Sequence, residues 1–238
     1  MARDSFLLRI NGLTKRFGGV AAVNQCSLSL EANRIYGLIG PNGSGKTTLF
    51  NLITGLLKSD AGEIHFKGEK TTRLPPYKIC RRGIGRTFQV IRVFPEMTVL
   101  DNMIVVAPDG GVGANRPRAL DLLDFVGLTY LRDEYAGNLS YGQQRLLEFV
   151  RVLMTNPELI LLDEPAAGVN PTLLNNLLEY IRELRKQGKT IVVVEHNMKV
   201  VMNLCEQIFV LDHGEKIAEG PPETIQRDER VLEAYFGR

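Results

Sequence analysis

The sequence predicts an α/β fold built on a mixed or parallel sheet, and two observations lead to this prediction. Residues 159–162 and 191–194 are uninterrupted apolar runs, as strands are when helices cover both faces of their sheet. Between these runs, apolar residues recur at the spacing of a helix that ends at Gly188: Leu173, Leu174, Leu177, Leu178, Ile181 and Leu184. A strand, a helix and a strand in this order favour a parallel α/β core.

The N-terminal part is predicted to add strands of another kind. Residues 6–10 and 26–30 alternate between apolar and polar side chains, which is typical of a half-buried antiparallel sheet. The short apolar run 35–39 indicates a buried strand, and it enters a glycine-rich loop. A helix is expected to follow from Gly45 to about Leu56.

The middle of the chain has a different pattern, which predicts a helical subdomain inserted into the core at about residues 90–155. Its segment 108–115 is rich in glycine and is predicted to be a flexible loop. The prediction is therefore one domain over residues 1–238, with a core of about 1–89 and 156–238.

Composition and charge exclude several classes of protein. The 238 residues suit one large domain, and the hydrophobic fraction of 44% is ordinary for a soluble protein. A net charge of +2 gives no sign of a nucleic-acid partner. No apolar run approaches the roughly 18 residues of a membrane helix, and the N-terminus has no signal-peptide core. The 3 cysteines lie far apart, without metal-ligand spacing. We therefore expect a cytosolic protein that reaches a membrane only through a partner.

A phosphate-binding loop is predicted at residues 40–47, which read GPNGSGKT and match the pattern G-x-x-x-x-G-K-S/T. Glycines let backbone N–H groups approach a phosphate closely, and the following helix adds its positive end. The predicted nucleotide-binding residues are Gly40, Pro41, Asn42, Gly43, Ser44, Gly45, Lys46, Thr47 and Thr48. The alternative is a simple glycine-rich turn between a strand and a helix.

Two residues of this loop have predicted roles. Lys46 would supply a charge for the β- and γ-phosphates, and Thr47 would supply a hydroxyl for Mg²⁺. We expect the Lys46 side chain to face solvent in the absence of nucleotide, so that its removal leaves the fold intact.

Asp163 and Glu164 end the apolar run 159–162. An unpaired carboxylate would be costly at the buried Asp163, and a water-mediated contact with Mg²⁺ would explain it. Glu164 is expected to point the other way, toward an attacking water. The alternative is a surface Asp-Glu turn before Pro165.

Residues 139–143 read LSYGQ, and Ser140 and Gln143 fit the capping box of a helix. The exposed N–H groups at such a helix start also suit an anion. The order of phosphate loop, L-S-x-G-Q and apolar run ending in Asp-Glu resembles the ATP-binding cassette (ABC) family, from about Phe6 to Phe236. The resemblance implies a P-loop NTPase (RecA-like) core that hydrolyses ATP. It also implies a pair of subunits, in which each phosphate loop faces the other subunit's L-S-x-G-Q across a shared ATP.

The resemblance assigns roles to residues outside the phosphate loop. Glu164 is implied as the general base for the attacking water. Gln89, at the end of the Q-loop 83–89, is implied to contact Mg²⁺ and this water and to link the core to the helical subdomain. His196 is implied as a contact of the γ-phosphate, although a lone histidine is usually structural. Phe17 would stack on adenine, the alternative being a core phenylalanine. The implied ligands of the partner's ATP are Ser140, Gly142 and Gln143, and those of Mg²⁺ are Thr47, Gln89 and Asp163.

The chain departs from the usual family pattern in three places. Tyr141 stands where many members have glycine. Asn170 stands in the D-loop 166–171 where aspartate is usual, so its amide would keep hydrogen bonds across the dimer without the charge. The helical subdomain is shorter than in many members.

Four segments resemble the ATPase subunits of branched-chain (hydrophobic) amino-acid importers: residues 139–145, 164–171, 194–198 and 231–236. The resemblance implies a peripheral subunit on the inner face of the cell membrane, in a homodimer or a heterodimer with a paralogous ATPase. Permease subunits would be direct partners, and an external solute-binding protein an indirect one. Alternatives are ATPases for urea or amide uptake or for lipopolysaccharide export. A soluble ABC protein of DNA or ribosomes is disfavoured by the single cassette without a coiled-coil insertion.

The segment 90–97 directly follows Gln89 and is predicted to dock a short cytoplasmic helix of the permease. Its apolar Phe94 and Met97 lie beside charged residues, as a helix-binding groove requires. The alternative is that both side chains only anchor the helical subdomain.

Overall fold

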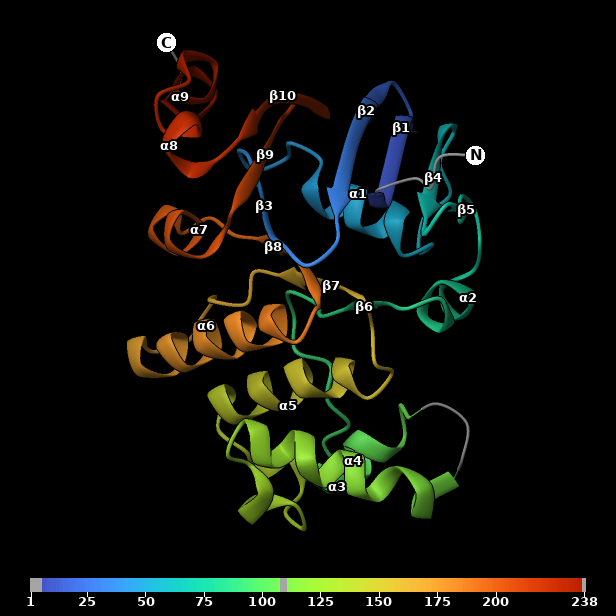
Figure 1. Cartoon of the computed structure of the whole chain (residues 1–238), viewed down its shortest axis with the longest axis vertical. Coiled ribbons are helices and arrows are strands. Elements are labelled where there is room, and N and C mark those ends of the chain that lie inside the picture. Colours follow the sequence, from blue (N-terminus) through green and yellow to red (C-terminus); the bar gives the residue numbers. More distant parts are fainter. Residues whose placement is uncertain (1–5, 108–110, 237–238) are drawn as a thin grey trace.

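The structure is a computed structural model that describes residues 6–107 and 111–236. Two sheets lie in the upper and middle parts of the molecule in Figure 1. The first is antiparallel, with the order β2-β1-β4-β5: β1 (Phe6–Phe17), β2 (Val20–Glu31), β4 (Ala61–Phe66) and β5 (Glu69–Lys70). These strands confirm the predicted antiparallel part at the N-terminus.

The second sheet has the order β10-β9-β3-β8-β7-β6. Its strands are β3 (Ile35–Ile39), β6 (Ile84–Arg86), β7 (Leu159–Asp163), β8 (Thr190–Val194), β9 (Gln207–Asp212) and β10 (Glu215–Gly220). All neighbours are parallel except β9 and β10, which form an antiparallel hairpin. The predicted mixed or parallel sheet is confirmed.

The central strands are buried on both faces, which explains their uninterrupted apolar sequences. All five residues of β3, β7 and β8 are buried. Ile160 and Leu162 of β7 pack into one hydrophobic core, whereas Leu159 and Leu161 pack into the other. Successive side chains of a strand point to opposite faces, so each strand supplies both cores.

Helices enclose this sheet. They are α1 (Lys46–Ile53), α2 (Pro76–Arg81), α6 (Pro171–Lys186), α7 (Met198–Leu204), α8 (Pro222–Ile225) and α9 (Glu229–Phe236). The predicted end of α6 is confirmed: Gly188 has φ 88°, its N–H donates to Arg185 O (2.9 Å), and the Lys189 N–H donates to Leu184 O (3.0 Å). These two bonds form a Schellman motif, in which glycine favours the left-handed conformation.

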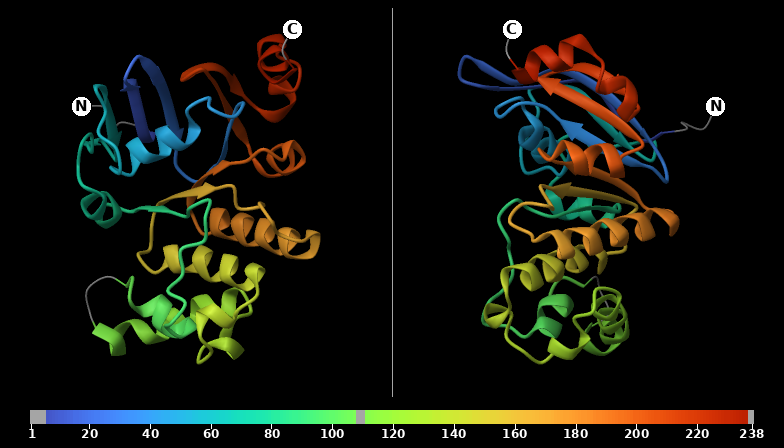
Figure 2. Two further views of the ribbon diagram at one scale, coloured as in Figure 1. Left: turned by 180° about the vertical axis from the view of Figure 1, so that it is seen from behind. Right: turned by 90° about the vertical axis from the view of Figure 1, so that its left-hand side faces the viewer.

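The segment between β6 and β7 is helical and lies together at the lower end of the molecule in Figures 1 and 2. It contains α3 (Val99–Ile104), α4 (Gly111–Phe125), two 3₁₀ turns (η1, Thr129–Leu131; η2, Ala136–Asn138) and α5 (Tyr141–Leu153). No helix in the described part of the chain is both long and apolar enough to cross a membrane.

The predicted loop at 108–115 is wrong from Gly111 onward, because α4 begins there; Pro108–Gly110 lie outside the described residues. Ala119 and Leu123 of α4 are fully buried, and the Asn115 side chain donates to Gly111 O one turn earlier (2.9 Å). Packing and this hydrogen bond outweigh the low helix propensity of glycine, which is only a weak local preference.

Candidate functional site

The phosphate-loop sequence connects β3 to α1, and its shape is fixed by two close backbone approaches. Gly40 has φ 150° and Gly45 has φ 102°. A Cβ atom added at Gly40 would lie 2.0 Å from Leu211 O, and one added at Gly45 would lie 2.2 Å from Ala22 O. Only glycine fits these positions, so the loop is held between the ends of β9 and β2.

Lys46 does not face solvent, and that prediction is wrong. The side chain is buried, and the residue is only 6% exposed. Its ammonium donates to Gly40 O (2.8 Å), Pro41 O (2.8 Å) and Ser44 Oγ (3.3 Å). An ammonium has three donors, and the curved loop turns three oxygen acceptors toward it. Burial lowers the pKa of Lys46, and the neighbouring Glu164 and Asp163 oppose this shift.

A cavity of about 400 Å³ is lined by the phosphate loop and by residues that follow three strands far apart in the sequence. Gln89 follows β6, Glu164 follows β7 and His196 follows β8. The whole lining is Ala22, Asn42, Gly43, Gly45, Lys46, Thr47, Thr48, Gln89, Glu164 and His196. Parallel strands bring their carboxyl ends to one edge of the sheet, where ligands of α/β proteins bind.

Glu164 is the centre of the polar contacts in this cavity. Its Oε2 accepts a hydrogen bond from the Gln89 amide (3.1 Å), and its Oε1 lies 3.0 Å from His196 Nε2. The backbone of Glu164 has φ 48°, a left-handed conformation that is unfavourable for a residue other than glycine. Such strain persists only where neighbouring contacts hold it, and here the Glu164 N–H donates to Val194 O (2.9 Å).

Asp163 is buried but not unpaired, so the premise that Mg²⁺ is needed to explain it is wrong. Arg86 donates to its Oδ2 (2.8 Å) and also to Asn51 Oδ1 (2.6 Å). The guanidinium carbon lies 5.4 Å from the Phe50 ring and 5.1 Å from the Phe88 ring. The ion pair compensates the burial of both charges. Arg86 was missed in the sequence, where its one signal is a cation on a short strand beside apolar residues.

Thr47 and Gln89 line the cavity, and Asp163 ends β7, directly before Glu164 in the chain. Hydroxyl, amide and carboxylate oxygens suit Mg²⁺, which is commonly bound by one or two carboxylates together with substrate phosphates. In the described part of the chain, no cluster of three or more histidine, cysteine or acidic side chains could hold a metal. The donor types of Thr47, Gln89 and Asp163 fit a Mg²⁺ that arrives with a nucleotide.

Seven predicted nucleotide-binding residues do not line this cavity: Phe17, Gly40, Pro41, Ser44, Ser140, Gly142 and Gln143. Phe17 is half-exposed at the end of β1, with Lys15 Nζ 5.5 Å from its ring centre, so the alternative of a core phenylalanine is wrong. Ser140, Gly142 and Gln143 lie at the start of α5. The predicted capping box is confirmed: Ser140 Oγ accepts from the Gln143 N–H (3.4 Å), and Gln143 Oε1 accepts from the Ser140 N–H (2.9 Å).

The residues that depart from the family pattern contact their own chain. The Tyr141 hydroxyl donates to Ala167 O in the D-loop (3.4 Å). Asn170 Oδ1 caps α6 by accepting from the Leu173 N–H (2.9 Å), which leaves its amide N–H groups for other partners. The buried Glu195, missed in the sequence, accepts from the Ala166 N–H (2.7 Å). Burial raises the pKa of Glu195, and this carboxylate joins the D-loop to the segment of His196.

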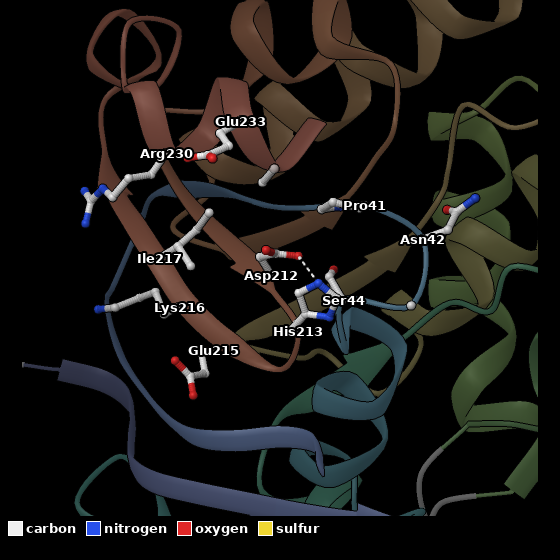
Figure 3. Close-up of a pocket in the computed structure, with 12 residues that line it drawn as sticks. Pro41, Asn42, Ser44, Asp212, His213, Glu215, Lys216, Ile217, Arg230 and Glu233 are labelled. Atoms are coloured by element: carbon white, nitrogen blue, oxygen red, sulfur yellow. Dashed lines mark ion pairs between the residues drawn. The ribbon is translucent and has the colours of Figure 1, made fainter. Parts of the chain in front are cut away.

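A second cavity of about 900 Å³ lies on the other side of the phosphate loop, between the β9–β10 turn and α9. Figure 3 shows Pro41, Asn42 and Ser44 on its wall, together with Asp212 and His213, which lie 3.7 Å apart. Two cationic side chains of this cavity pair with neighbours, Lys216 with Glu219 and Arg230 with Asp228. We assign it no ligand.

Comparison with known proteins gives matches over nearly the whole chain. Residues 23–167 match the family described as "ABC transporter", and residues 215–238 match the family described as "Branched-chain amino acid ATP-binding cassette transporter". The high-affinity branched-chain amino acid transport ATP-binding protein BraF of Pseudomonas aeruginosa is 40% identical, over 97% of this chain and 98% of that protein. The corresponding protein LivG of Salmonella typhimurium is 42% identical, over the same shares.

Solved structures agree with these matches. A nucleotide-free ATP-binding cassette from an ABC transporter has a TM-score of 0.91 at 35% identity, covering 98% of this chain and 100% of that one. An ADP conformation of such a cassette has a TM-score of 0.89 at 36% identity, over 98% and 99%. A dimeric post-hydrolysis cassette bound to ADP and Pi has a TM-score of 0.81 at 28% identity, over 90% and 98%.

Proposed function

Because the chain belongs to the ABC transporter family of ATP-binding proteins, we propose that it powers the uptake of branched-chain or other hydrophobic amino acids through a partner permease. The observation that carries this proposal is the C-terminal match at residues 215–238, which adds to 40% identity with BraF over 97% of the chain. On this proposal the protein works on the inner face of the membrane, bound to its permease.

The test of the substrate is uptake of labelled leucine and of labelled urea by cells that produce this chain with the permease encoded beside it. Leucine uptake that competes with isoleucine and valine, and that Glu164→Gln abolishes, supports the proposal. Uptake of urea but not of leucine would favour the alternative of urea or amide transport.

We propose the following division of labour within the cavity. Glu164 takes a proton from the attacking water, while Gln89 and His196 hold the two carboxylate oxygens of Glu164. Lys46 exchanges its loop acceptors for phosphate oxygens. Thr47, Gln89 and Asp163 would hold Mg²⁺, which supplies neutralisation of phosphate charge when it is bound. Phe17, half-exposed at the end of β1, would stack on the adenine ring.

We further propose that the site is completed by a second subunit. Ser140, Gly142 and Gln143 lie outside the cavity, yet they form a helix start suited to an anion. A partner subunit of the same kind, or a paralogue, would place them over the γ-phosphate. The dimeric cassette bound to ADP and Pi, at 28% identity, is a precedent for such pairing.

Ser140→Arg is expected to reduce ATP turnover strongly, and nucleotide binding to the isolated subunit only slightly, because Ser140 serves the neighbour's ATP. The sharper measurement is ATPase activity of a mixture of Ser140→Arg with Lys46→Ala. In a mixed dimer one composite site carries both changes and the other carries none, so partial activity should return.

The control for Ser140 is Thr98→Ala, because Ser140 also caps α5 and an N-cap contributes roughly 1 kcal/mol. Thr98 caps α3 in the same way, accepting from the Asp101 N–H (3.0 Å), without belonging to the predicted site. A mixture that stays inactive, although mixed dimers form, would exclude composite sites that act independently.

The permease surface is proposed at the groove between the sheet and the helical subdomain, taken as residues 90–155. A cavity of about 300 Å³ there includes Ile79, Phe88 and Arg151 in its lining. The Arg151 guanidinium lies 5.1 Å from the ring of Phe94, which is 44% exposed and belongs to neither hydrophobic core. An apolar side chain at the edge of a groove supports docking more than anchoring.

Phe94→Asp is expected to leave the thermal stability and ATPase activity of the isolated subunit unchanged, and to abolish co-purification with the permease and transport. The matched control is Leu232→Asp, since Leu232 is also 44% exposed but lies on α9. Loss of stability in the isolated Phe94 variant would favour the anchoring alternative. A stable Phe94 variant that still transports would overturn the docking proposal.

A further inference from the structure

Helix α5 carries a buried ion pair, Arg145 and Glu148, that the nucleotide site described above does not use. Arg145 Nη1 lies 3.0 Å from Glu148 Oε2, and the two side chains are 4% and 3% exposed. Burial raises the pKa of Glu148, and Arg145 opposes this shift. Two buried charges are tolerated only when further hydrogen bonds satisfy them, so the remaining partners of this pair matter.

Those partners are all backbone groups of the segments that carry Gln89 and Glu164. Arg145 Nη1 donates to Phe88 O (2.8 Å) and Gln89 O (3.5 Å). Its Nη2 donates to Asp163 O (3.2 Å) and to Glu164 O. One planar guanidinium thus bonds the backbone that follows β6 and the backbone at the end of β7.

Glu148 holds the same loop from its other side. Its Oε1 accepts from the N–H groups of Phe88 and Arg92 (both 3.4 Å). Phe88 is therefore bound at both its N–H and its C=O by the same ion pair. These bonds fix the backbone next to Gln89 and thereby the direction of the Gln89 side-chain amide.

The contact between Gln89 and Glu164 depends on both backbones. Gln89 Nε2 lies 3.1 Å from Glu164 Oε2, and Glu164 has the strained φ of 48°. A strained conformation persists when its surroundings over-determine it, and Arg145 bonds the Glu164 carbonyl directly. Arg145 also lies in the second turn of α5, the helix that Ser140 caps. It therefore connects the L-S-x-G-Q segment to the residues of the cavity.

We propose that Arg145 and Glu148 are positioning residues: their hydrogen bonds couple the position of helix α5 to the orientation of the Gln89 and Glu164 side chains. The rate of hydrolysis therefore depends on the pair, and the binding of ATP does not. The inference rests on the proposed role of Glu164 as the base. The competing explanation is that the pair only stabilises the packing of α5.

The decisive variant is the double change Arg145→Met with Glu148→Leu. Replacement of a buried ion pair by apolar residues of similar size often preserves stability. Here it also removes the Arg145 donors from four carbonyl groups, of which Glu164 O keeps the Ala167 N–H (3.1 Å). We expect the variant to stay folded with a lowered Tm, because backbone groups lose their partners, and its KM for ATP to stay within about threefold. We expect kcat to fall by roughly 10- to 100-fold, the scale of misplacing a reacting group by about 1 Å.

Arg145→Lys covers the case in which the double variant does not fold. Lysine keeps the charge beside Glu148, but its single nitrogen cannot span the carbonyl groups of both strands. We expect kcat to fall by roughly tenfold or more at an unchanged KM. A lysine variant with the wild-type kcat, or a folded double variant within about threefold of it, would overturn the proposal.

Two further variants separate this proposal from its premise. The control Arg182→Met with Glu179→Leu removes an exposed pair of the same spacing on α6 and should leave kcat unchanged. Glu164→Gln is measured alongside. Normal hydrolysis by Glu164→Gln would remove the premise, whereas slow hydrolysis by it together with full activity of the Arg145 and Glu148 variants would reject the positioning role alone.

Discussion

Glu164→Gln is expected to slow ATP hydrolysis by roughly 10²–10⁴, the usual scale for losing a general base, while ATP binding stays intact. Glutamine keeps the shape of the side chain. Its oxygen can still accept from the Gln89 amide, and its NH₂ group can donate to His196, but it cannot take a proton from water. The site therefore keeps its geometry and loses its base.

The variant should also hold two subunits together, because ATP that is bound but not hydrolysed keeps the composite site closed. Size-exclusion chromatography with ATP, with and without Mg²⁺, measures this. The control is Glu195→Gln, which changes a neighbouring buried carboxyl that contacts the Ala166 N–H and not the cavity. Near-normal hydrolysis by Glu164→Gln would remove Glu164 from the role of base.

Lys46→Ala is expected to abolish tight binding of nucleotide phosphates. The ammonium is the one cationic side chain among the residues that line the cavity, and in the structure it is already held at the loop by three acceptors. Titration with ATP and with adenosine separates the phosphate contribution from that of the base and sugar. Unchanged affinity for ATP would mean that the phosphate-loop assignment is wrong.

The buried position of Lys46 changes the expected effect on stability. Its removal leaves Gly40 O without the Lys46 donor, and Pro41 O keeps only the Ser44 N–H (3.2 Å), so the Tm should fall by roughly 2–4 °C rather than stay constant. Lys67→Ala is the control, because Lys67 pairs with Glu158 on the surface. An apparent loss of binding would be uninterpretable only if the variant were unfolded, and its thermal transition measures this directly.

Periodicity and motif spacing were enough to predict the layers of the fold. The apolar runs 159–162 and 191–194 predicted β7 and β8, because a strand that is buried on both faces has apolar side chains at every position. The end of α6 at Gly188 followed from the need of a helix terminus for a left-handed residue. The resemblance carried by residues 40–47, 139–143 and 159–164 indicated the family, since these motifs lie in a fixed order.

Polar contacts between segments that are far apart in the chain could not be predicted from the sequence. Arg86 and Asp163 are separated in sequence by the whole helical subdomain, and they meet because β6 lies beside β7, with Arg86 opposite Leu161. Lys46 was expected in solvent because a loop sequence does not show that its carbonyl groups turn inward. The start of α4 at Gly111 was likewise decided by packing, which overrode local propensity.

The sequence by itself thus determined the apolar strands, the loop chemistry and the capped helix starts, because each depends on neighbours within about one or two helical turns. The tertiary structure alone decided which charges are paired. Arg145 could have been a solvated residue of an amphipathic helix, but the docking of α5 on β6 and β7 places it on the backbone of Gln89 and Glu164. A buried charge takes its role from whatever hydrogen-bond partners the fold brings to it, and those partners come from three separate segments of the chain.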